Sequence, residues 1–341
     1  MRLADFVDYI SERKDAVYSK ICDYVQIKDP VQHYRMVREY TDRKGNYRRP
    51  GLLMLSGQIF GASMDDLVVP AAAMQLSEDW ILIHDDVEDH SEMRRGKPTL
   101  HVIYGDALAI NAGDAAHIAM WKMLQDYTYG AKHGNEVYDK FYHMIEHTLE
   151  GQYKDTDFVR NIRSMGKSSE RFYFDVIESK TCYYTVYGPM QIGAIVAGQG
   201  RKTLDMLERV GRPAGRAFQI MDDILDMTAD EKTFGKKRYG DIYEGKATLM
   251  VIHAYGQAGA GEKEMVDRVY SKRWNEKTPD DIAKVVGIIE KYGGIEYAKS
   301  VAKSNGQEAK DALKESISVF PQNDYTGIMS EAIEGLYNRI K

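Results

Sequence analysis

Apolar residues recur every three or four positions along most of the chain, which is the spacing that lines one face of an α-helix. The stretch from Leu204 to Thr228 shows the pattern clearly. Strict alternation of apolar and polar residues, which is typical of a half-buried strand, is scarce. The pattern therefore predicts an all-α fold, with helices over residues 66–89, 105–128, 135–153, 170–198, 204–230 and 280–300.

Clusters of Gly, Pro, Asp, Asn and Lys interrupt the periodic stretches, as expected where helices end. Only 8 prolines occur among the 341 residues. No internal repeat, low-complexity segment or change of composition indicates a linker between domains. We therefore expect residues 1–341 to form a single all-helical domain, with breaks at 42–50, 90–98, 130–135, 155–168, 232–246, 258–262 and 320–326.

Composition narrows the class of protein. The chain is 43% hydrophobic and 29% charged, as in an ordinary soluble globular protein. Its net charge of −6, without a block of Lys or Arg, argues against nucleic acid as a partner. Cys22 and Cys182 lie far apart, outside any metal-ligand spacing, and no apolar run fits a signal peptide or a membrane span. These features predict a cytoplasmic protein that is not an integral membrane protein.

Two segments that each begin with a pair of aspartates carry the candidate chemistry. Asp85–Asp89 reads Asp-Asp-Val-Glu-Asp at the end of an apolar helix, and Asp222–Asp226 reads Asp-Asp-Ile-Leu-Asp inside another. Residues four apart share a helical face, so the first and last Asp of each segment project together and repel each other. Mg²⁺ relieves such repulsion, because it prefers oxygen ligands and typically binds a few carboxylates together with substrate phosphates.

The alternative interpretation is that each segment forms a solvated acidic face. Apolar residues argue against it, since Trp80–Ile83 precede the first segment and Phe218, Ile220 and Met221 precede the second. A solvated face would carry mixed polar residues instead. We therefore expect two acidic helices that face each other and hold several Mg²⁺ ions with a diphosphate between them.

In order and spacing, further motifs resemble those of the trans-isoprenyl diphosphate synthases, the polyprenyl synthetases. The resemblance covers about residues 40 to 250 and is strongest to archaeal-type short-chain geranylgeranyl and farnesyl diphosphate synthases. The motifs that carry it, besides the two acidic segments, are Met93–His101 (MRRGKPTLH), Gly151–Asp155 (GQYKD), Lys180-Thr181, Phe218–Asp223 (FQIMDD), Phe234–Lys236 (FGK), Gly240–Ile242 (GDI) and Gly245–Thr248 (GKAT).

The resemblance implies a single large helical bundle of the isoprenoid synthase type around a central apolar cavity. It implies a Mg²⁺-dependent prenyltransferase of isoprenoid biosynthesis, with about three ions per active site and a homodimeric assembly. The implied reaction condenses isopentenyl diphosphate, the acceptor, with an allylic diphosphate. The allylic group leaves its pyrophosphate as a carbocation, which the acceptor's double bond attacks.

The resemblance also implies roles for single residues. Asp85, Asp89 and Asp222 are expected to bind Mg²⁺ directly, with Asp226 acting through water and Asp155 contributing. The expected catalytic set is Asp85, Asp86, Asp89, Asp222, Asp223, Asp226 and Lys180. Contacts to the allylic diphosphate are expected from Arg94, Lys180, Thr181, Gln219, Lys236 and Lys246, and contacts to isopentenyl diphosphate from Arg49 and Arg95, with Asn46 and Glu78 at two further positions of that site.

The chain departs from the family at those last two positions. The family usually reads Gly-Lys-x-x-Arg-Pro, whereas Asn46 stands here in place of the lysine. Glu78 stands seven residues before Asp85, where the family commonly has a histidine. A synthase with a rearranged acceptor site is our first interpretation, because Arg49, Arg95 and both acidic segments remain. A terpene synthase or a prenyltransferase with another acceptor or none comes second, and a non-catalytic partner subunit third.

Residues just before the first acidic segment form the floor of the product pocket in this family. Trp80 and Ile81 are bulky at these positions, which favours a short product of C15–C20, with geranylgeranyl diphosphate first. The alternative is that Trp80 belongs simply to the core. Two further patterns are set aside. His143–His147 has the spacing of a zinc-protease helix, but such a site would need a further acidic ligand arranged around it. Gly240–Thr248 resembles a P-loop, but Ala247 stands in place of the required Ser or Thr and no strand precedes it.

Overall fold

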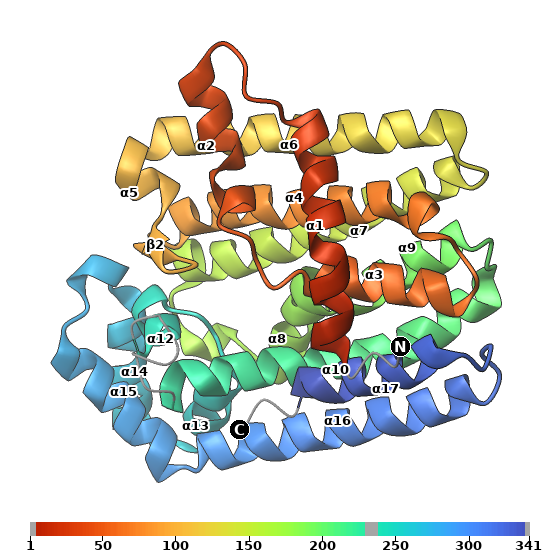
Figure 1. Cartoon of the computed structure of the whole chain (residues 1–341). Coiled ribbons are helices and arrows are strands. Elements are labelled where there is room, and N and C mark those ends of the chain that lie inside the picture. Colours follow the sequence, from red (N-terminus) through yellow and green to blue (C-terminus); the bar gives the residue numbers. More distant parts are fainter. Residues whose placement is uncertain (1–4, 229–237, 338–341) are drawn as a thin grey trace. The chain divides into compact units, whose positions relative to one another are not determined.

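The computed structural model describes residues 5–228 and 238–337, which are almost entirely helical (Figure 1). Within these ranges the only strands are β1 (Met93–Arg94) and β2 (Lys97–Pro98), which pair antiparallel. The predicted all-α fold is therefore confirmed. None of the helices described is both long enough and apolar enough to cross a membrane.

The described residues group into two compact units. The first comprises residues 5–145, 184–210 and 310–334, and the second comprises 146–183, 211–309 and 335–337 without 229–237. Five elements contribute residues to both units: α7 (Gly134–Asp157), η3 (Glu178–Tyr187), α10 (Arg201–Thr228), α16 (Gly294–Ile317) and α17 (Asp324–Tyr337). The expectation of one domain over the whole chain stays a prediction.

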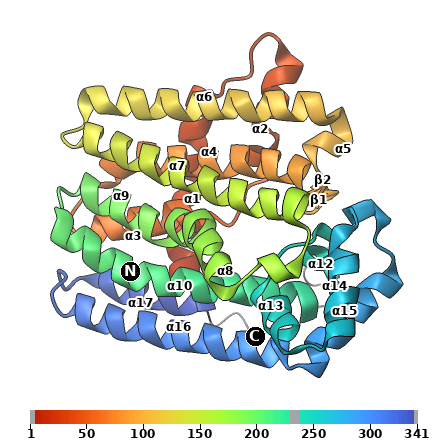
Figure 2. The same ribbon diagram turned by 180° about the vertical axis from the view of Figure 1, so that it is seen from behind.

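Two long helices of the first unit, α4 (Met64–Glu88) and α6 (Asp106–Gly130), lie alongside each other (Figures 1 and 2). Both bury alanines, including Ala71–Ala73 on α4 and Ala112 and Ala116 on α6, which permits close approach of the two backbones. Ser63 caps α4, since its hydroxyl accepts from the Asp66 N–H at 3.2 Å. The other elements of this unit are α1 (Phe6–Tyr24), α2 (Val31–Asp42), α3 (Arg48–Ile59), α5 (Leu100–Tyr104), α9 (Gly188–Val196) and most of α17 (Asp324–Tyr337).

A close contact between α3 and α9 fixes the start of α3 within the first unit. A Cβ atom at Gly193 would lie 2.0 Å from the carbonyl oxygen of Leu53, so a side chain at this position would separate the helices. The Ser56 hydroxyl also donates to the carbonyl oxygen of Met190 at 2.7 Å. Because α3 is held in this way, the two arginines at its N-terminal end, Arg48 and Arg49, have a defined position.

The second unit consists of shorter helices that pack on one another (Figure 2). Ser169 and Thr278 cap two of these helices through their hydroxyl groups. The π-helical segment η3 carries Lys180. Gly151 packs closely against it, because a Cβ atom at this glycine would lie 2.6 Å from the backbone nitrogen of Lys180. The elements are η1 (Phe158–Ile162), η2 (Met165–Lys167), α8 (Glu170–Ile177), α12 (Gly240–Glu244), α13 (Leu249–Gln257), α14 (Ala260–Ser271), η4 (Trp274–Glu276) and α15 (Pro279–Lys291).

The helices differ from the expected ones in two places. The single helix expected over 280–300 is wrong, because α15 ends at Lys291 and α16 begins at Gly294. Gly293 adopts a φ of 65°, a left-handed conformation that ends a helix and that glycine adopts without strain. The stretch 170–198 is helical throughout its length but is divided into α8, η3 and α9.

Candidate functional site

The hairpin that follows α4 presents two adjacent arginines. Arg95 and Gly96 form its turn with positive φ values of 52° and 75°. The Arg43 guanidinium holds the hairpin, because it donates to the carbonyl oxygens of Arg94 at 3.0 Å and Pro98 at 2.8 Å. The side chains of Arg94 and Arg95 therefore leave a braced turn next to the end of α4.

The paired aspartates of the first acidic segment lie in different environments. Asp86 is fully buried and accepts hydrogen bonds from the Tyr40 hydroxyl at 2.6 Å and from Arg94 Nε at 2.9 Å. Burial and the negative charge of Asp86 raise the pKa of Tyr40, so the phenol stays protonated as a donor. The Asp85 carboxylate is 19% exposed and lies 3.8 Å from Arg94. Asp85 is thus the more accessible of the pair. Asp89, one turn later, is also partly exposed.

A second cluster in the same unit contains both arginines expected at the acceptor site. Arg49 lies 3.2 Å and Arg95 lies 3.5 Å from the Glu78 carboxylate. Arg95 also donates to Asp79 at 3.0 Å, and burial raises the pKa of Asp79. The cluster is therefore a network of two guanidinium groups and two carboxylates. Asn46 lies in the loop before α3 and is exposed.

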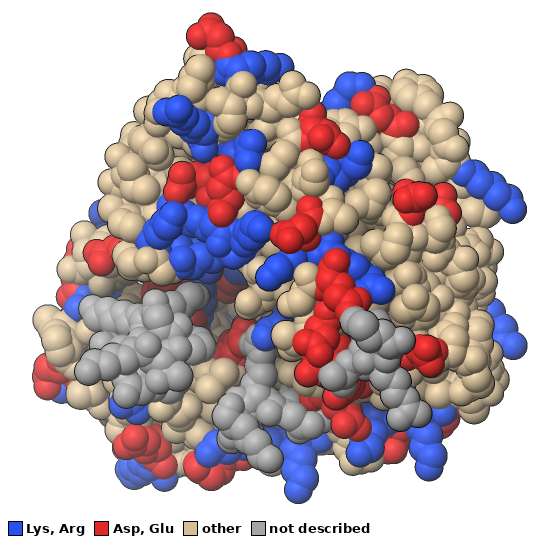
Figure 3. Space-filling model, viewed as in Figure 1, with Lys and Arg blue, Asp and Glu red and all other residues tan. Residues whose placement is uncertain are grey.

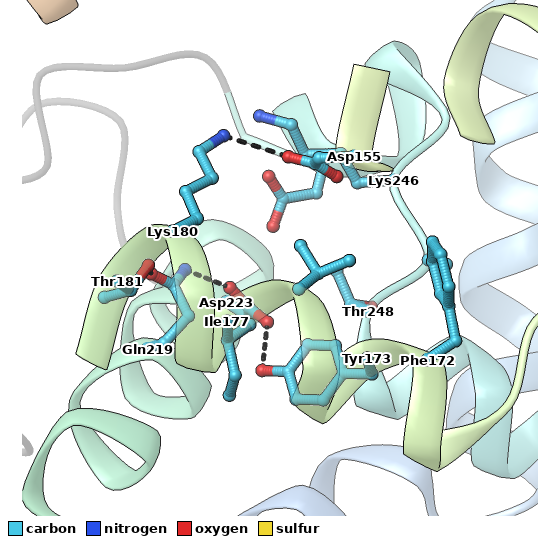
Figure 4. A pocket seen from close by; sticks show the side chains of 13 residues that line it. Asp155, Phe172, Tyr173, Ile177, Lys180, Thr181, Gln219, Asp223, Lys246 and Thr248 are labelled. Atoms are coloured by element: carbon cyan, nitrogen blue, oxygen red, sulfur yellow. Dashed lines mark hydrogen bonds and ion pairs between the residues drawn. The ribbon is translucent and has the colours of Figure 1, made fainter. Parts of the chain in front are cut away.

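The second unit contains a pocket lined by residues of α7, α8, η3, α10 and the loop after α12 (Figure 4). At its rim Lys180 donates to Asp155 at 2.9 Å. On its wall Thr181 donates to Gln219 at 2.9 Å, and Gln219 donates to Asp223 at 2.8 Å. The pocket thus brings together residues that lie as much as 93 positions apart along the chain. Its full lining is Asp155, Phe172, Tyr173, Val176, Ile177, Lys180, Thr181, Gln219, Asp223, Asp241, Lys246, Ala247 and Thr248.

Asp223 is the buried member of the second aspartate pair. It accepts from the Tyr173 hydroxyl at 2.7 Å as well as from Gln219. Burial raises the pKa of Asp223 to about 7, and the two hydrogen bonds partly offset that effect. Its partner Asp222 is partly exposed. Each acidic segment therefore pairs an accessible first aspartate with a buried second one.

The short helix α12 connects the second acidic segment to Lys246. At its start the N–H groups of Gly240 and Asp241 donate to the Asp226 carboxylate at 3.1 and 3.2 Å. At its end the buried amino group of Lys277 donates to the carbonyl oxygens of Ile242 at 2.8 Å and Tyr243 at 2.9 Å. Burial lowers the pKa of Lys277 to about 8.

Gly245 makes this arrangement possible and leads to Lys246. Its φ is 95°, and a Cβ atom there would lie 3.1 Å from the Lys277 amino nitrogen. The Tyr270 hydroxyl donates to the carbonyl oxygen of Lys246 at 3.1 Å, and the Lys246 side chain pairs with Glu244 at 2.5 Å. The turn thus directs Lys246 to the pocket.

The carboxylate oxygens of these clusters are ligands of the type that a hard divalent cation prefers. Asp241 is partly buried, and its pKa is well above its ordinary value because of desolvation and the negative charges of Asp226 and Asp223. Such an excess of negative charge is what a bound cation would relieve. Within the described residues no three acidic, His or Cys side chains converge into a complete metal site.

Two of the expected site residues, Trp80 and Ile81, lie outside these clusters. Lys236 lies outside the described residues. Trp80 is buried with its ring centroid 4.4 Å from that of His117 on α6, and Ile81 is partly exposed. The role of Trp80 and Ile81 in product length stays a prediction.

Sequence reasoning missed several residues that hold the site together. Asp79 and Asp241 could have been predicted from the sequence. Asp79 precedes Asp86 by seven residues on one helical face, and Asp241 belongs to the Gly-Asp-Ile motif. Tyr40, Tyr173 and Lys277 carry no local signal, because each acts on a segment at least 34 positions away.

Basic and acidic side chains also lie next to each other on the surface, so that neither sign alone covers the face in Figure 3. This mixture agrees with the small net charge of −6.

Comparison with known proteins gives consistent results across the chain. A sequence profile described as polyprenyl synthetase matches residues 31–289. The geranylgeranyl diphosphate synthase of Methanosarcina mazei is 31% identical over 313 residues, which cover 92% of this chain and 93% of that protein. The geranylfarnesyl diphosphate synthase of Aeropyrum pernix is 35% identical over 274 residues, which cover 79% of this chain and 83% of that protein.

Solved structures agree. The geranylgeranyl pyrophosphate synthetase of Pyrococcus horikoshii matches with a TM-score of 0.85 at 28% identity, covering 98% of each chain. A polyprenyl synthase of Caulobacter crescentus, complexed with calcium and isoprenyl diphosphate, matches with a TM-score of 0.85 at 26% identity, covering 98% of this chain and 97% of that one. On these grounds, together with the motifs and the all-helical fold, the chain is a prenyltransferase that belongs to the polyprenyl synthetase family.

Proposed function

We propose that this protein condenses isopentenyl diphosphate with an allylic diphosphate, giving a short-chain prenyl diphosphate of C15–C20 with geranylgeranyl diphosphate favoured. The observation that carries the proposal is the pocket of the second unit, where cationic, amide and hydroxyl groups meet carboxylates in one cavity. A diphosphate needs such donors, and the cations that accompany it need the carboxylates. The relatives named geranylgeranyl diphosphate synthase support the choice of product.

The allylic diphosphate is assigned to the cationic groups of the pocket. Lys180 and Lys246 are both partly exposed at its lining, and each now pairs with a carboxylate, Asp155 and Glu244 respectively. Phosphate oxygens would replace these carboxylates as partners of the two amino groups. Thr181 and Gln219 add a hydroxyl and an amide, and we assign Arg94 and Lys236 to the same ligand.

The metal ligands are assigned to carboxylates of both acidic segments and to Asp155. Asp85, Asp89 and Asp222 would hold Mg²⁺ directly, with Asp226 acting through water and Asp155 contributing, for about three ions. Bound Mg²⁺ supplies positive charge that stabilises the departing pyrophosphate. The Caulobacter crescentus structure with calcium and isoprenyl diphosphate supports a divalent cation here.

The buried aspartates and their donors have a positioning role in this proposal. Asp86 holds Arg94 and Asp223 holds Gln219 by hydrogen bonds, which orients each donor for a phosphate oxygen. The carbon–oxygen bond of the allylic substrate breaks, and its electron pair leaves with the pyrophosphate. The double bond of isopentenyl diphosphate attacks the resulting cation, and a proton leaves to pyrophosphate. No protein nucleophile takes part.

A terpene synthase, or a prenyltransferase with another acceptor or none, is the second candidate. One observation favours it: Glu78 lies beside Arg49 and Arg95, where an acceptor diphosphate was expected. Ionisation of an allylic diphosphate would be the same in both cases. The two candidates differ in whether isopentenyl diphosphate is consumed.

One assay separates the candidates. Purified protein and Mg²⁺ are incubated with labelled isopentenyl diphosphate and, in turn, dimethylallyl, geranyl and farnesyl diphosphate. A longer labelled diphosphate is the result we expect, with geranylgeranyl diphosphate as the main product. Release of pyrophosphate with a hydrocarbon or alcohol product and no label would favour the second candidate. Inertness with every substrate would favour a non-catalytic subunit.

Lys277→Met is expected to weaken binding of pyrophosphate with Mg²⁺ about tenfold, because the end of α12 loses both hydrogen bonds to that amino group and Lys246 loses its fixed position. Isothermal titration calorimetry measures the change. Lys277→Arg should restore part of the affinity. Lys272→Met is the matched control, since Lys272 pairs with Asp281 at 2.7 Å in the same unit. Equal losses in both methionine variants would show general destabilisation and contradict the prediction.

A homodimer is proposed through the outer face of α5 and α6. Ile118 is 69% exposed there, and a patch of such residues is unusual on a monomer. Ile118→Asp is expected to shift the protein from dimer to monomer in sedimentation velocity. Val7→Asp on α1 is the control, because Val7 is also 69% exposed. A monomeric wild type, or a dimer that survives Ile118→Asp, would oppose this assignment. The exposed apolar residues of the face are Val102, Ile103, Leu108, Ile110 and Ile118.

A further inference from the structure

The two arginines assigned to the acceptor's diphosphate already have carboxylate partners in their own unit. Arg49 lies 3.2 Å from Glu78, and Arg95 lies 3.5 Å from Glu78 and 3.0 Å from Asp79. The four groups sum to zero charge. A diphosphate that approaches this cluster meets two carboxylates beside the two guanidinium groups.

The two carboxylates are held very differently. Asp79 is fully buried and accepts hydrogen bonds from Thr41 at 2.7 Å and Gln75 at 3.1 Å in addition to Arg95. Withdrawing it would leave several buried donors without a partner, which is costly. The Glu78 side chain is 14% exposed, and within the described residues its partners are the two arginines. Glu78 is therefore the carboxylate that can exchange with an incoming anion.

Neighbouring donors have spare capacity for such an anion. The Tyr47 hydroxyl and Arg49 Nε are buried and have no hydrogen-bond partner among the described residues. Burial and the negative charges of Asp79 and Glu78 raise the pKa of Tyr47, so the phenol remains a donor. The backbone of Gly45 lies against Arg95, since a Cβ there would lie 2.7 Å from its guanidinium. The loop before α3 thus closes around the cluster.

We propose that Glu78 is an internal counter-ion that competes with the acceptor's diphosphate for Arg49 and Arg95 and so sets the affinity for the acceptor. The inference rests on the proposed function and adds a residue that determines acceptor affinity. In the empty cluster Glu78 neutralises the guanidinium pair. When the acceptor binds, its phosphate oxygens replace the Glu78 carboxylate, which turns towards solvent. The affinity for the acceptor is reduced by the stability of the ion pairs that are given up.

Glu78→Gln tests the competition, because it keeps the size of the side chain and removes its charge. We expect the Kd of isopentenyl diphosphate, measured by calorimetry without an allylic substrate, to fall about tenfold, and its KM to fall in parallel. The Kd of the allylic diphosphate should stay within a factor of two, because Glu78 pairs with Arg49 and Arg95, which are not among the ligands assigned to it. Glu78→Asp, which keeps the charge, should remain near the wild type. Glu12→Gln is the matched control, since Glu12 pairs with Arg13 at 3.1 Å in the same unit.

The outcomes distinguish this inference from the proposed function. An unchanged or weaker affinity for isopentenyl diphosphate in a folded Glu78→Gln variant overturns the competition, because Glu78 would then orient the arginines for the ligand. The proposed function survives that result as long as the wild type incorporates labelled isopentenyl diphosphate. If neither protein binds isopentenyl diphosphate and the wild type incorporates no label, both fail. Thermal unfolding of each variant verifies its fold.

Discussion

Asp85→Ala is expected to lower turnover about 10³-fold, because an electrostatic group that acts on the departing pyrophosphate typically contributes an effect of this size. Asp85 lies on the last turn of α4 with its carboxylate 19% exposed, so it is available to a cation. When Asp85 is removed, Arg94 keeps its hydrogen bonds to Asp86. The fold should therefore remain intact. Pyrophosphate release gives the rate, and circular dichroism gives the melting temperature.

Another aspartate of the same helix provides the control for Asp85→Ala. Asp65 is exposed in the first turn of α4, far along the helix from Asp85. Asp65→Ala should retain near-normal turnover. For the residual activity of Asp85→Ala, the Mg²⁺ concentration that gives the half-maximal rate should be higher than for the wild type. A nearly normal rate in Asp85→Ala would remove this residue from the metal site.

Asp86→Ala is expected to act mainly on stability, with a loss of about 3–5 kcal/mol in the free energy of unfolding. Asp86 is fully buried between Tyr40 and Arg94. Its removal leaves the Arg94 guanidinium, whose side chain is 15% exposed, without its main counter-charge and leaves the Tyr40 hydroxyl without an acceptor. Urea unfolding followed by circular dichroism measures the loss.

Two variants make the assignment of Asp86 specific. Tyr40→Phe removes one donor and should cost about 1 kcal/mol. Asp86→Asn keeps the shape of the side chain but removes its charge, so most of the loss should remain. Asp86→Ala with unchanged stability and abolished activity would instead place Asp86 among the metal ligands.

The boundaries of the long helices follow from local sequence. Helices α4, α6 and α10 begin and end within a few residues of the expected limits. Neighbouring residues alone indicate both the apolar stripe of a helix and the polar residues or glycine at its ends. The break at Gly293 was missed, since a glycine inside a strongly periodic stretch is also compatible with a continuous helix. The π-helical geometry of η3 was not visible either, because π and α segments share the same residue types.

The sequence by itself determined the fold class, the two acidic segments, and the departures at Asn46 and Glu78. These are properties of residue type and short spacing, which are present before the chain folds. Only the tertiary structure decided how the roles divide within each aspartate pair. Tyr40 buries Asp86, and Tyr173 buries Asp223, over separations of 46 and 50 positions.

The same holds for Glu78. Its presence was evident from the sequence, but its position between Arg49 and Arg95 depends on α3, α4 and the hairpin packing together. Burial and pairing of charge arise from contacts between distant segments, and local periodicity does not encode them. For this reason the sequence names the residues of the site, whereas the packing of the chain decides which of them can meet a ligand.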